Sequence, residues 1–277
     1  AIGASEGRTL AAETIGTVPP LLGDVTNAEL VAALGADILL LNLFDVEKPA
    51  IQGLPPVEPT EVVREVKRLT GRPVGINLEP VEAGAVEVDT LWAMTKGRLA
   101  TLENAQRAAD MGVNFILLTG TNRAITDTLK LFHERLGETL ILAAGKMHAS
   151  GVLGEGGENI ITKAEVKDFA KAGADVILLP APGTVPGITT GFVRDMVEYA
   201  HSLGCLAMTA IGTSQEGADP DTIRRIALEC KMAGADIHHL GDSGYTGIAA
   251  PENITAYSMA IRGLRHTYRR MAASINR

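Results

Sequence analysis

The chain has 277 residues, of which 46% are hydrophobic, so it can bury the core of one large α/β domain or of two smaller ones. Its formal net charge of −8 argues against non-specific binding to nucleic acid or to a membrane surface, because both need a cationic surface. No stretch reaches the roughly 18 uninterrupted apolar residues of a membrane helix, and the two cysteines show no metal or redox spacing. We therefore expect a cytoplasmic protein with reduced cysteines. Because the sequence starts at Ala1, we also expect its N-terminus to be incomplete.

Eight short apolar strands are predicted. Four share a sequence pattern and begin at Gly35 (GADILLLNLFD), Gly112 (GVNFILLTGTN), Gly173 (GADVILLPAPG) and Gly234 (GADIHHLGDSG). The intervals of 77, 61 and 61 residues are too long for one strand-helix unit of about 30 residues and fit two. The missing partners begin at Arg8 (RTLAAETIG), Arg72 (RPVGINLEP), Glu138 (ETLILAAGKMH) and Gly204 (GCLAMTAIG).

Helices are predicted between these strands. Capping boxes start at Thr26 (TNAE) and Thr162 (TKAE), and Pro251 stands where a first-turn proline would open the last helix. Runs such as EVVREVKRL and TIRRIALECKMAG carry apolar residues at helical spacing. Eight alternating strand-helix pairs favour a single (β/α)8 TIM barrel over residues 1–277, with a doubly wound open sheet as the alternative.

In a barrel of this kind, chemistry collects at the C-terminal ends of the strands. Side chains alternate across a strand, so Asn77 and Glu79 are expected to share the inward face, as are Lys146 and His148. The repeat gives His239 the inward parity and turns His238 toward the helices. The polar strand ends that we expect to bind substrate inside the barrel are Asn42, Asn77, Thr119 and Asn122.

The loops after strands seven and eight are rich in small residues, which let backbone amides approach a ligand closely. Such loops hold a substrate phosphate in many barrels. The predicted phosphate-binding residues are Gly212, Thr213, Ser214, Gly241, Ser243 and Gly244, and Asp242 beside them is predicted to bind substrate. A purely steric role of the glycines is the alternative.

Lys146 is the strongest candidate for chemistry. At the end of an apolar strand it is expected to be poorly hydrated, and therefore to act as a nucleophile or a proton carrier. Glu13 and Glu79 are candidates for general acid or base, His148 for a proton shuttle, and His239 for a further catalytic role. The alternative is a buried ion pair of Lys146 with Glu79 or Glu13.

Three long connections follow strand ends and are expected to serve as lids or subunit contacts: EKPAIQGLPPVEP from Glu47, PVEAGAVEVDTLWAMTKGRLAT from Pro80 and GVLGEGGENI from Gly151. The last contains no G-x-G-x-x-G or P-loop pattern, so we expect no nucleotide and no other cofactor. The arginine-rich stretch RGLRHTYRRMAASINR is expected to be a solvated helix face, with a phosphate-binding or partner-binding role as the alternative.

The spacing of the GAD-type strands and the small-residue loops resemble the phosphate-binding (β/α)8 barrels, a group that includes aldolases, epimerases and synthases of phosphosugars. More narrowly, AETIGTVPPLLGDVTNAEL and GDSGYTGIAAPENI resemble a bacterial TIM-barrel family whose members are sometimes labelled haloacid-dehalogenase-like or phosphonomutase-like. The first label needs a D-x-D-x-T/V motif after a strand, but the nearest match, at Asp219, opens a helix. An acidic cluster that would hold magnesium, as in the second, is not evident.

These observations predict an enzyme acting on a small phosphorylated, sugar-derived substrate by lyase (aldolase) or isomerase chemistry. One alternative is a divalent-metal enzyme using Glu13, Glu79, His148 and His239. Another is a non-catalytic barrel that binds a phosphorylated metabolite. The expected partners are that metabolite and, as one option, further copies of the chain in a homo-oligomer.

Overall fold

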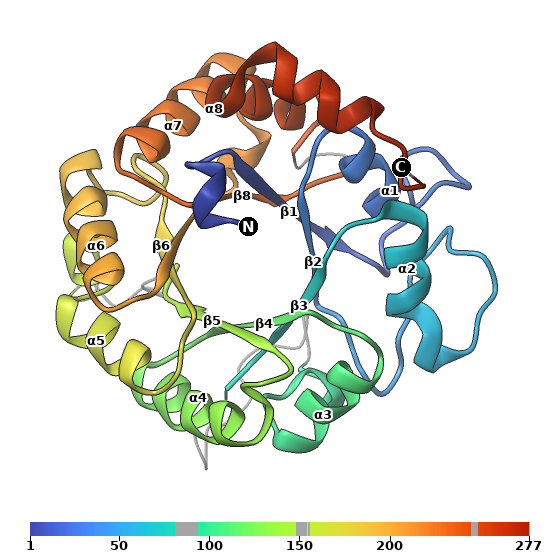
Figure 1. Cartoon of the computed structure of the whole chain (residues 1–277), viewed down its shortest axis with the longest axis horizontal. Coiled ribbons are helices and arrows are strands. Elements are labelled where there is room, and N and C mark those ends of the chain that lie inside the picture. Colours follow the sequence, from blue (N-terminus) through green and yellow to red (C-terminus); the bar gives the residue numbers. More distant parts are fainter. Residues whose placement is uncertain (81–93, 148–153, 155, 245–248, 277) are drawn as a thin grey trace.

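Eight parallel strands close into a barrel, and helices cover its outside (Figure 1). The computed structural model describes residues 1–80, 94–147, 154, 156–244 and 249–276. The strands are β1 (Thr9–Ile15), β2 (Ile38–Asn42), β3 (Val74–Leu78), β4 (Phe115–Thr119), β5 (Ile141–Gly145), β6 (Val176–Pro180), β7 (Leu206–Ala210) and β8 (Ile237–Asp242). Because β8 pairs with β1, the predicted TIM barrel is confirmed and the open sheet is excluded.

The helices alternate with the strands. They are α1 (Asn27–Ala33), α2 (Val62–Thr70), α3 (Leu102–Asp110), α4 (Asn122–Leu136), α5 (Lys163–Lys171), α6 (Thr190–Ser202), α7 (Pro220–Met232) and α8 (Pro251–Ala272). The capping boxes predicted at Thr26 and Thr162 begin α1 and α5, and Pro251 lies in the first turn of α8. Among the helices that the structure describes, none combines the length and the apolar character needed to cross a membrane.

Apolar side chains form two separate clusters. One fills the barrel and includes Ala11, Leu40, Leu117 and Met208, which point inward from their strands. The larger one packs the outward faces of the strands against the helices, and it contains both free cysteines. Apolar packing therefore closes the barrel interior toward the N-terminal ends of the strands, and only the mouth at the C-terminal ends is polar.

The repeated aspartate holds the strands in pairs at the opposite, N-terminal end of the barrel. The carboxylate of Asp37 accepts a hydrogen bond of 2.9 Å from the amide of Leu10 in β1, and the Asp37 amide donates one of 2.7 Å to the Leu10 carbonyl. Equivalent reciprocal pairs join Asn114 to Val74, Asp175 to Leu142, and Asp236 to Ala207. We call these four contacts the strand clamps. Each fixes the register of one strand against the next.

The glycine two positions before each clamp residue has a backbone conformation that other residues rarely adopt. The φ angles of Gly35, Gly112, Gly173 and Gly234 are 121°, 90°, 103° and 92°. In this left-handed conformation glycine has no steric penalty, so the chain can leave a helix and enter the next strand at once. In each repeat, the glycine thus allows the turn from helix to strand, and the clamp residue fixes the strand register.

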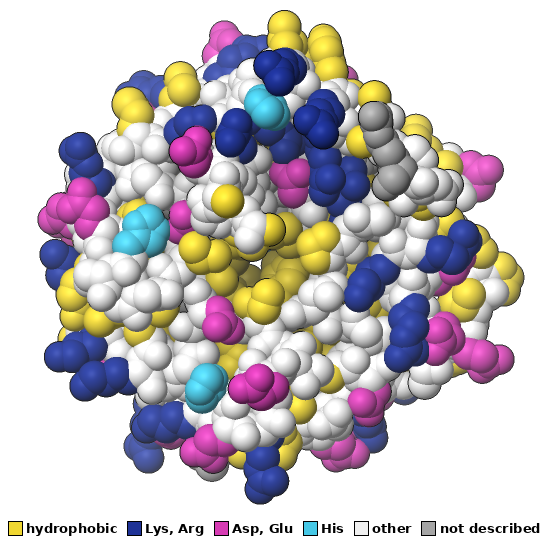
Figure 2. Space-filling view, in the orientation of Figure 1, with side chains coloured by type: hydrophobic (Ala, Val, Ile, Leu, Met, Phe, Trp, Pro, Cys, Tyr) yellow, Lys and Arg dark blue, Asp and Glu magenta, His cyan; other side chains and the backbone are white. Residues whose placement is uncertain are grey.

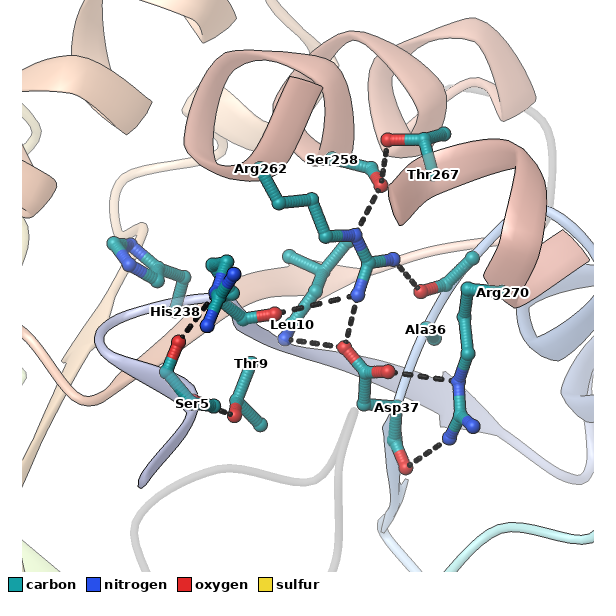
Figure 3. A network of polar contacts seen from close by, with 12 residues as sticks. Ser5, Thr9, Leu10, Ala36, Asp37, His238, Ser258, Arg262, Thr267 and Arg270 are labelled. Carbon is teal, nitrogen blue, oxygen red and sulfur yellow. Dashed lines mark hydrogen bonds and ion pairs between the residues drawn. The ribbon is translucent and has the colours of Figure 1, made fainter. Parts of the chain in front are cut away.

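Helix α8 is the longest of these helices and packs against α7 and α1 in the outer layer (Figure 1). It bends at Gly263, and two of its arginines bind Asp37: Arg262 Nη1 lies 2.6 Å and Arg270 Nε 2.7 Å from the carboxylate (Figure 3). The expectation of a solvated face is therefore wrong for Arg262 and Arg270, whereas Arg265 and Arg269 are exposed. Figure 2 shows this end of the molecule, with Lys and Arg side chains gathered over α8.

Of the three long connections, the one after β2 lies within the described residues. Gln52 donates from its backbone amide to Gly16, at 2.8 Å, and so joins this connection to the loop after β1. Most of the connections from Pro80 and Gly151 lies outside the described residues. Their roles as lids or subunit contacts remain predictions.

Replacing Asp37 by alanine should destabilise the protein more than the same change at Asp175. Asp175→Ala leaves one strand amide without its acceptor, at a cost of about 1–3 kcal/mol. Asp37→Ala also leaves Arg262, whose side chain is 4% exposed, without its counter-charge, which raises the cost to about 3–5 kcal/mol. Urea unfolding of both variants measures the difference, and equal losses would show that the arginines add nothing to the clamp.

Candidate active site

A cavity of about 830 Å³ opens at the C-terminal ends of the strands. Thirteen of the predicted site residues line it: Glu13, Asn42, Asn77, Glu79, Thr119, Asn122, Lys146, Gly212, Thr213, Ser214, His239, Gly241 and Asp242. Its lining also includes residues that we did not predict, among them Thr121, Met147, Glu165 and Glu216. His148 lies outside the described residues. The strand ends of the whole barrel thus contribute to one space.

Two predicted phosphate-binding residues lie apart from the described lining. Ser243 is fully buried, and its hydroxyl donates to the Gly241 carbonyl at 3.1 Å. Gly244 packs against Asn27 of α1. The small residues at these two positions therefore have a packing role in the loop after β8.

The two histidines of β8 point in opposite directions, as the parity of the repeat predicts. His238 is fully buried against α8, where its Nδ1 lies 3.2 Å from the hydroxyl of Tyr257 and its Nε2 lies 3.1 Å from the carbonyl of Gly7. His239 faces the cavity, with its Nε2 3.4 Å from Glu13 Oε2. The position expected for His238 in the helix layer and the inward position of His239 are confirmed.

A β-bulge turns Asp242 into the cavity as well. Along β1, His239 pairs with Ala11 and Asp242 pairs with Glu13, so β8 carries an extra residue between the two pairs. Gly241, with φ of 94°, supplies the left-handed conformation that such a bulge requires. In a regular strand the side chains of His239 and Asp242 would point to opposite faces, because the two residues are three positions apart. The bulge instead brings both side chains beside Glu13.

The deepest polar groups form a continuous network. Asn77 Nδ2 donates to Glu13 Oε1 at 2.9 Å and to Asn42 Oδ1 at 3.1 Å, and Asn42 Nδ2 donates to Asp242 Oδ1 at 3.2 Å. We call Glu13, Asn42, Asn77, His239 and Asp242 the floor of the cavity. These side chains come from β1, β2, β3 and β8, which are neighbours in the closed barrel.

Burial changes the ionisation of the floor. It raises the pKa of Glu13 to about 8, with the charge of Asp242 as a second cause, and it also raises the pKa of Asp242 and of Glu216. The pKa of His239 falls to about 4 for the same reason. At neutral pH Glu13 is therefore mainly a carboxylic acid and His239 is a neutral imidazole. Since His239 Nδ1 accepts from the Gly241 amide at 3.2 Å, the proton of the neutral ring is on Nε2.

Lys146 lies on the other side of the cavity. It follows the row of Leu142 and Ala144, which face the helices, and its Nζ reaches Glu165 Oε1 of α5 at 3.5 Å. Within the described residues its carboxylate partner is thus Glu165, rather than Glu79 or Glu13 as in the alternative of a buried ion pair. The other carboxylate oxygen of Glu165 caps α5 by accepting from the Thr162 amide at 2.8 Å, so the helix start positions the partner of Lys146.

Glu79 is held at the edge of the cavity by Arg98. Their side chains form an ion pair, and the Glu79 amide also donates to the Arg98 carbonyl at 2.9 Å. Glu79 is one of the four residues of the metal-site hypothesis. Among the described residues, no three His, Cys, Asp or Glu side chains are grouped so that they could hold a metal ion.

The turn after β7 presents backbone amides. Thr213 and Ser214 both have left-handed φ angles, of 55° and 60°. The Thr213 hydroxyl donates to the Thr184 carbonyl, and the Gly212 amide donates to the Thr184 hydroxyl at 3.3 Å, which locks the turn against the loop after β6. Within the described part of the chain, the amides of Thr213 and Ser214 have no hydrogen-bond acceptor.

A family model described as Domain of unknown function (DUF7916) matches residues 1–277. The chain belongs to the DUF7916 family. The haloacid-dehalogenase-like and phosphonomutase-like labels gain no support from the structure. Asp219, the start of the nearest phosphatase-type motif, is the N-cap residue of α7, where its carboxylate accepts from the amides of Asp221 and Thr222.

Beyond the DUF7916 family, part of the chain resembles a protein of Haemophilus influenzae named "Putative N-acetylmannosamine-6-phosphate 2-epimerase". The two are 34% identical over 88 residues, which is 32% of this chain and 33% of that protein. The chain thus matches about a third of the length of this relative.

Two solved structures share the fold. Thiamine phosphate pyrophosphorylase from Pyrococcus furiosus has a TM-score of 0.53 and 13% identity, over 96% of this chain and 98% of that one. A structure described as "Native KDPGal structure" has a TM-score of 0.53 and 14% identity, over 91% and 94%. At these identities the similarity shows the fold alone.

Glu13→Gln should make the protein relatively more stable as the pH rises. In the wild type, ionising the buried Glu13 side chain costs free energy that the unfolded chain does not pay, so stability from this group falls between its ordinary pKa of 4.5 and its folded pKa of about 8. The difference in free energy of unfolding between the variant and the wild type, measured by urea unfolding, should shift in favour of the variant by more than about 1 kcal/mol between pH 5 and pH 9. A difference that stays constant with pH would contradict the raised pKa.

Proposed function

We propose that the chain is an enzyme that acts on a small phosphosugar by isomerase or lyase chemistry. The observation that carries the proposal is that one cavity holds Lys146, paired with Glu165, together with the protonated Glu13. The cavity of about 830 Å³ has the size of a small-molecule site. The partial similarity to a protein named as an epimerase of N-acetylmannosamine 6-phosphate supports a phosphosugar as the substrate class.

Isomerases and aldolases of sugars share a chemical step, the movement of a proton or a bond at the carbon next to a carbonyl group. A lysine can perform this step as a base, or it can form an imine with the carbonyl carbon. Lys146 is 8% exposed at the cavity wall, where water competes little with a substrate. Glu165 beside it can accept a proton, and Glu13 can donate one to a developing oxyanion.

The phosphate group is proposed to bind at the turn after β7. The amides of Thr213 and Ser214 are hydrogen-bond donors at the cavity wall, and Gly212 lines the cavity beside them. Of the residues predicted for the loop after strand eight, Gly241 and Asp242 lie at the end of β8 and line the cavity, but the Asp242 side chain belongs to the floor. The β7 turn is therefore the better anion site of the two predicted loops.

Solvent exchange tests this function without requiring the net reaction to be known. In D2O, an enzyme that removes a proton next to a carbonyl replaces that hydrogen by deuterium, which proton NMR detects. We expect exchange with N-acetylmannosamine 6-phosphate or another sugar 6-phosphate. Lys146→Ala should lower its rate at least about 100-fold, and Lys167→Ala, an exposed lysine of the same helix as Glu165, should leave it unchanged.

The outcomes separate the alternatives. Exchange that survives Lys146→Ala would exclude lysine chemistry. Binding of sugar phosphates without exchange would indicate a non-catalytic barrel, and exchange lost on chelation and restored by a divalent ion would indicate a metal enzyme. Borohydride then distinguishes the two lysine roles, because it traps the ligand on Lys146 only if an imine forms.

A further inference from the structure

The floor of the cavity contains two polar atoms without a hydrogen-bond partner. They are Nε2 of His239 and Oδ1 of Asn77, both buried, and neither has a partner among the described residues. His239 is 4% exposed, and both residues line the cavity. Nε2 lies 3.4 Å from Glu13 Oε2, but without the geometry of a hydrogen bond. Because buried polar groups are normally paired, the donor Nε2–H and the acceptor Oδ1 are suited to bind a group of a ligand.

We propose that the floor is a subsite for an uncharged oxygen of the ligand, a hydroxyl or carbonyl group, and that it rejects anionic groups. His239 Nε2–H would donate to such an oxygen, and Asn77 Oδ1 would accept from a hydroxyl. On the proposed function, this subsite takes the unphosphorylated end of the sugar and leaves the phosphate near the mouth of the cavity.

The charges around the floor argue against an anion there. Three acidic side chains lie close together here: the charges of Asp242 and Glu216 raise the pKa of Glu13, and the charge of Asp242 raises the pKa of Glu216. An added negative charge at this depth would lose its hydration, and the ionised forms of Asp242 and Glu216 would repel it. His239 offers no compensation, because the imidazole is neutral at neutral pH. Binding of a carboxylate or phosphate group on the floor is therefore disfavoured, whereas a neutral hydroxyl group loses little hydration free energy there.

The arrangement also gives the ligand one orientation. The floor is built from β1, β2, β3 and β8, while Lys146 follows β5 and the turn of Thr213 follows β7. A ligand with one neutral and one anionic end satisfies both sides only when its neutral end points down. The substrate class that follows is a sugar with a single phosphate and an uncharged opposite end, and sugar acids or bisphosphates are excluded.

Crystals of the wild type soaked in glycerol and sodium sulfate test the subsite directly. We expect a glycerol hydroxyl about 3 Å from His239 Nε2 and Asn77 Oδ1, and sulfate outside the floor. Asn77→Leu should remove glycerol from the floor, while the matched variant Asn159→Leu, at an exposed position outside the described lining of the cavity, should keep it there. A thermal unfolding measurement on each variant verifies that it is folded.

Sulfate or a divalent cation bound on the floor would overturn the proposal, as would a wild-type floor that takes no glycerol. Glycerol retained in the same position by Asn77→Leu would overturn it too. The soak is independent of turnover. If no deuterium exchange occurs but glycerol binds on the floor, the enzyme proposal fails and the neutral subsite stands. If deuterium exchange occurs but glycerol does not bind on the floor, the subsite proposal fails and the enzyme proposal stands.

Discussion

The strand clamps are the constraint on which the rest of the structure depends. In each, a side chain at the base of an even-numbered strand binds the backbone amide of the strand before it and returns a hydrogen bond from its own amide. A slip of one residue in a strand would exchange its inward and outward side chains. By fixing the register at the base, Asp37, Asn114, Asp175 and Asp236 determine which side chains reach the cavity at the other end.

The chemistry of the cavity follows from that register together with one deviation from it. The clamp at Asp236 starts β8 so that His239 points inward, and the bulge at Gly241 then adds Asp242 to the same side. Two carboxyl groups, Glu13 and Asp242, become neighbours in a poorly hydrated space. Their raised pKa values are a consequence of where the strands place them, and they provide a carboxylic acid at neutral pH.

Much of this could be predicted from the sequence, because it depends on local pattern. The repeat revealed the eight strands, and alternation along a strand correctly assigned His238 to the helix layer and His239 to the barrel interior. Residues beyond a strand end escape that rule. Lys146 follows β5, so its partner Glu165 depends on where α5 packs, and the sequence shows Glu165 only as part of a capping box. Similarly, the turn of Asp242 depends on a bulge, and the binding of Asp37 to Arg262 joins residues far apart in the chain.

One ligand that spans the cavity would place its neutral end on the floor and its anionic end at the β7 turn. The most direct measurement is a titration of ¹⁵N-labelled protein with N-acetylmannosamine 6-phosphate, followed by NMR. We expect the side-chain amide signals of Asn42 and Asn77 and the backbone amide signals of Thr213 and Ser214 to shift at the same ligand concentration. Shifts at the β7 turn alone, or only on the outside of the barrel, would contradict it.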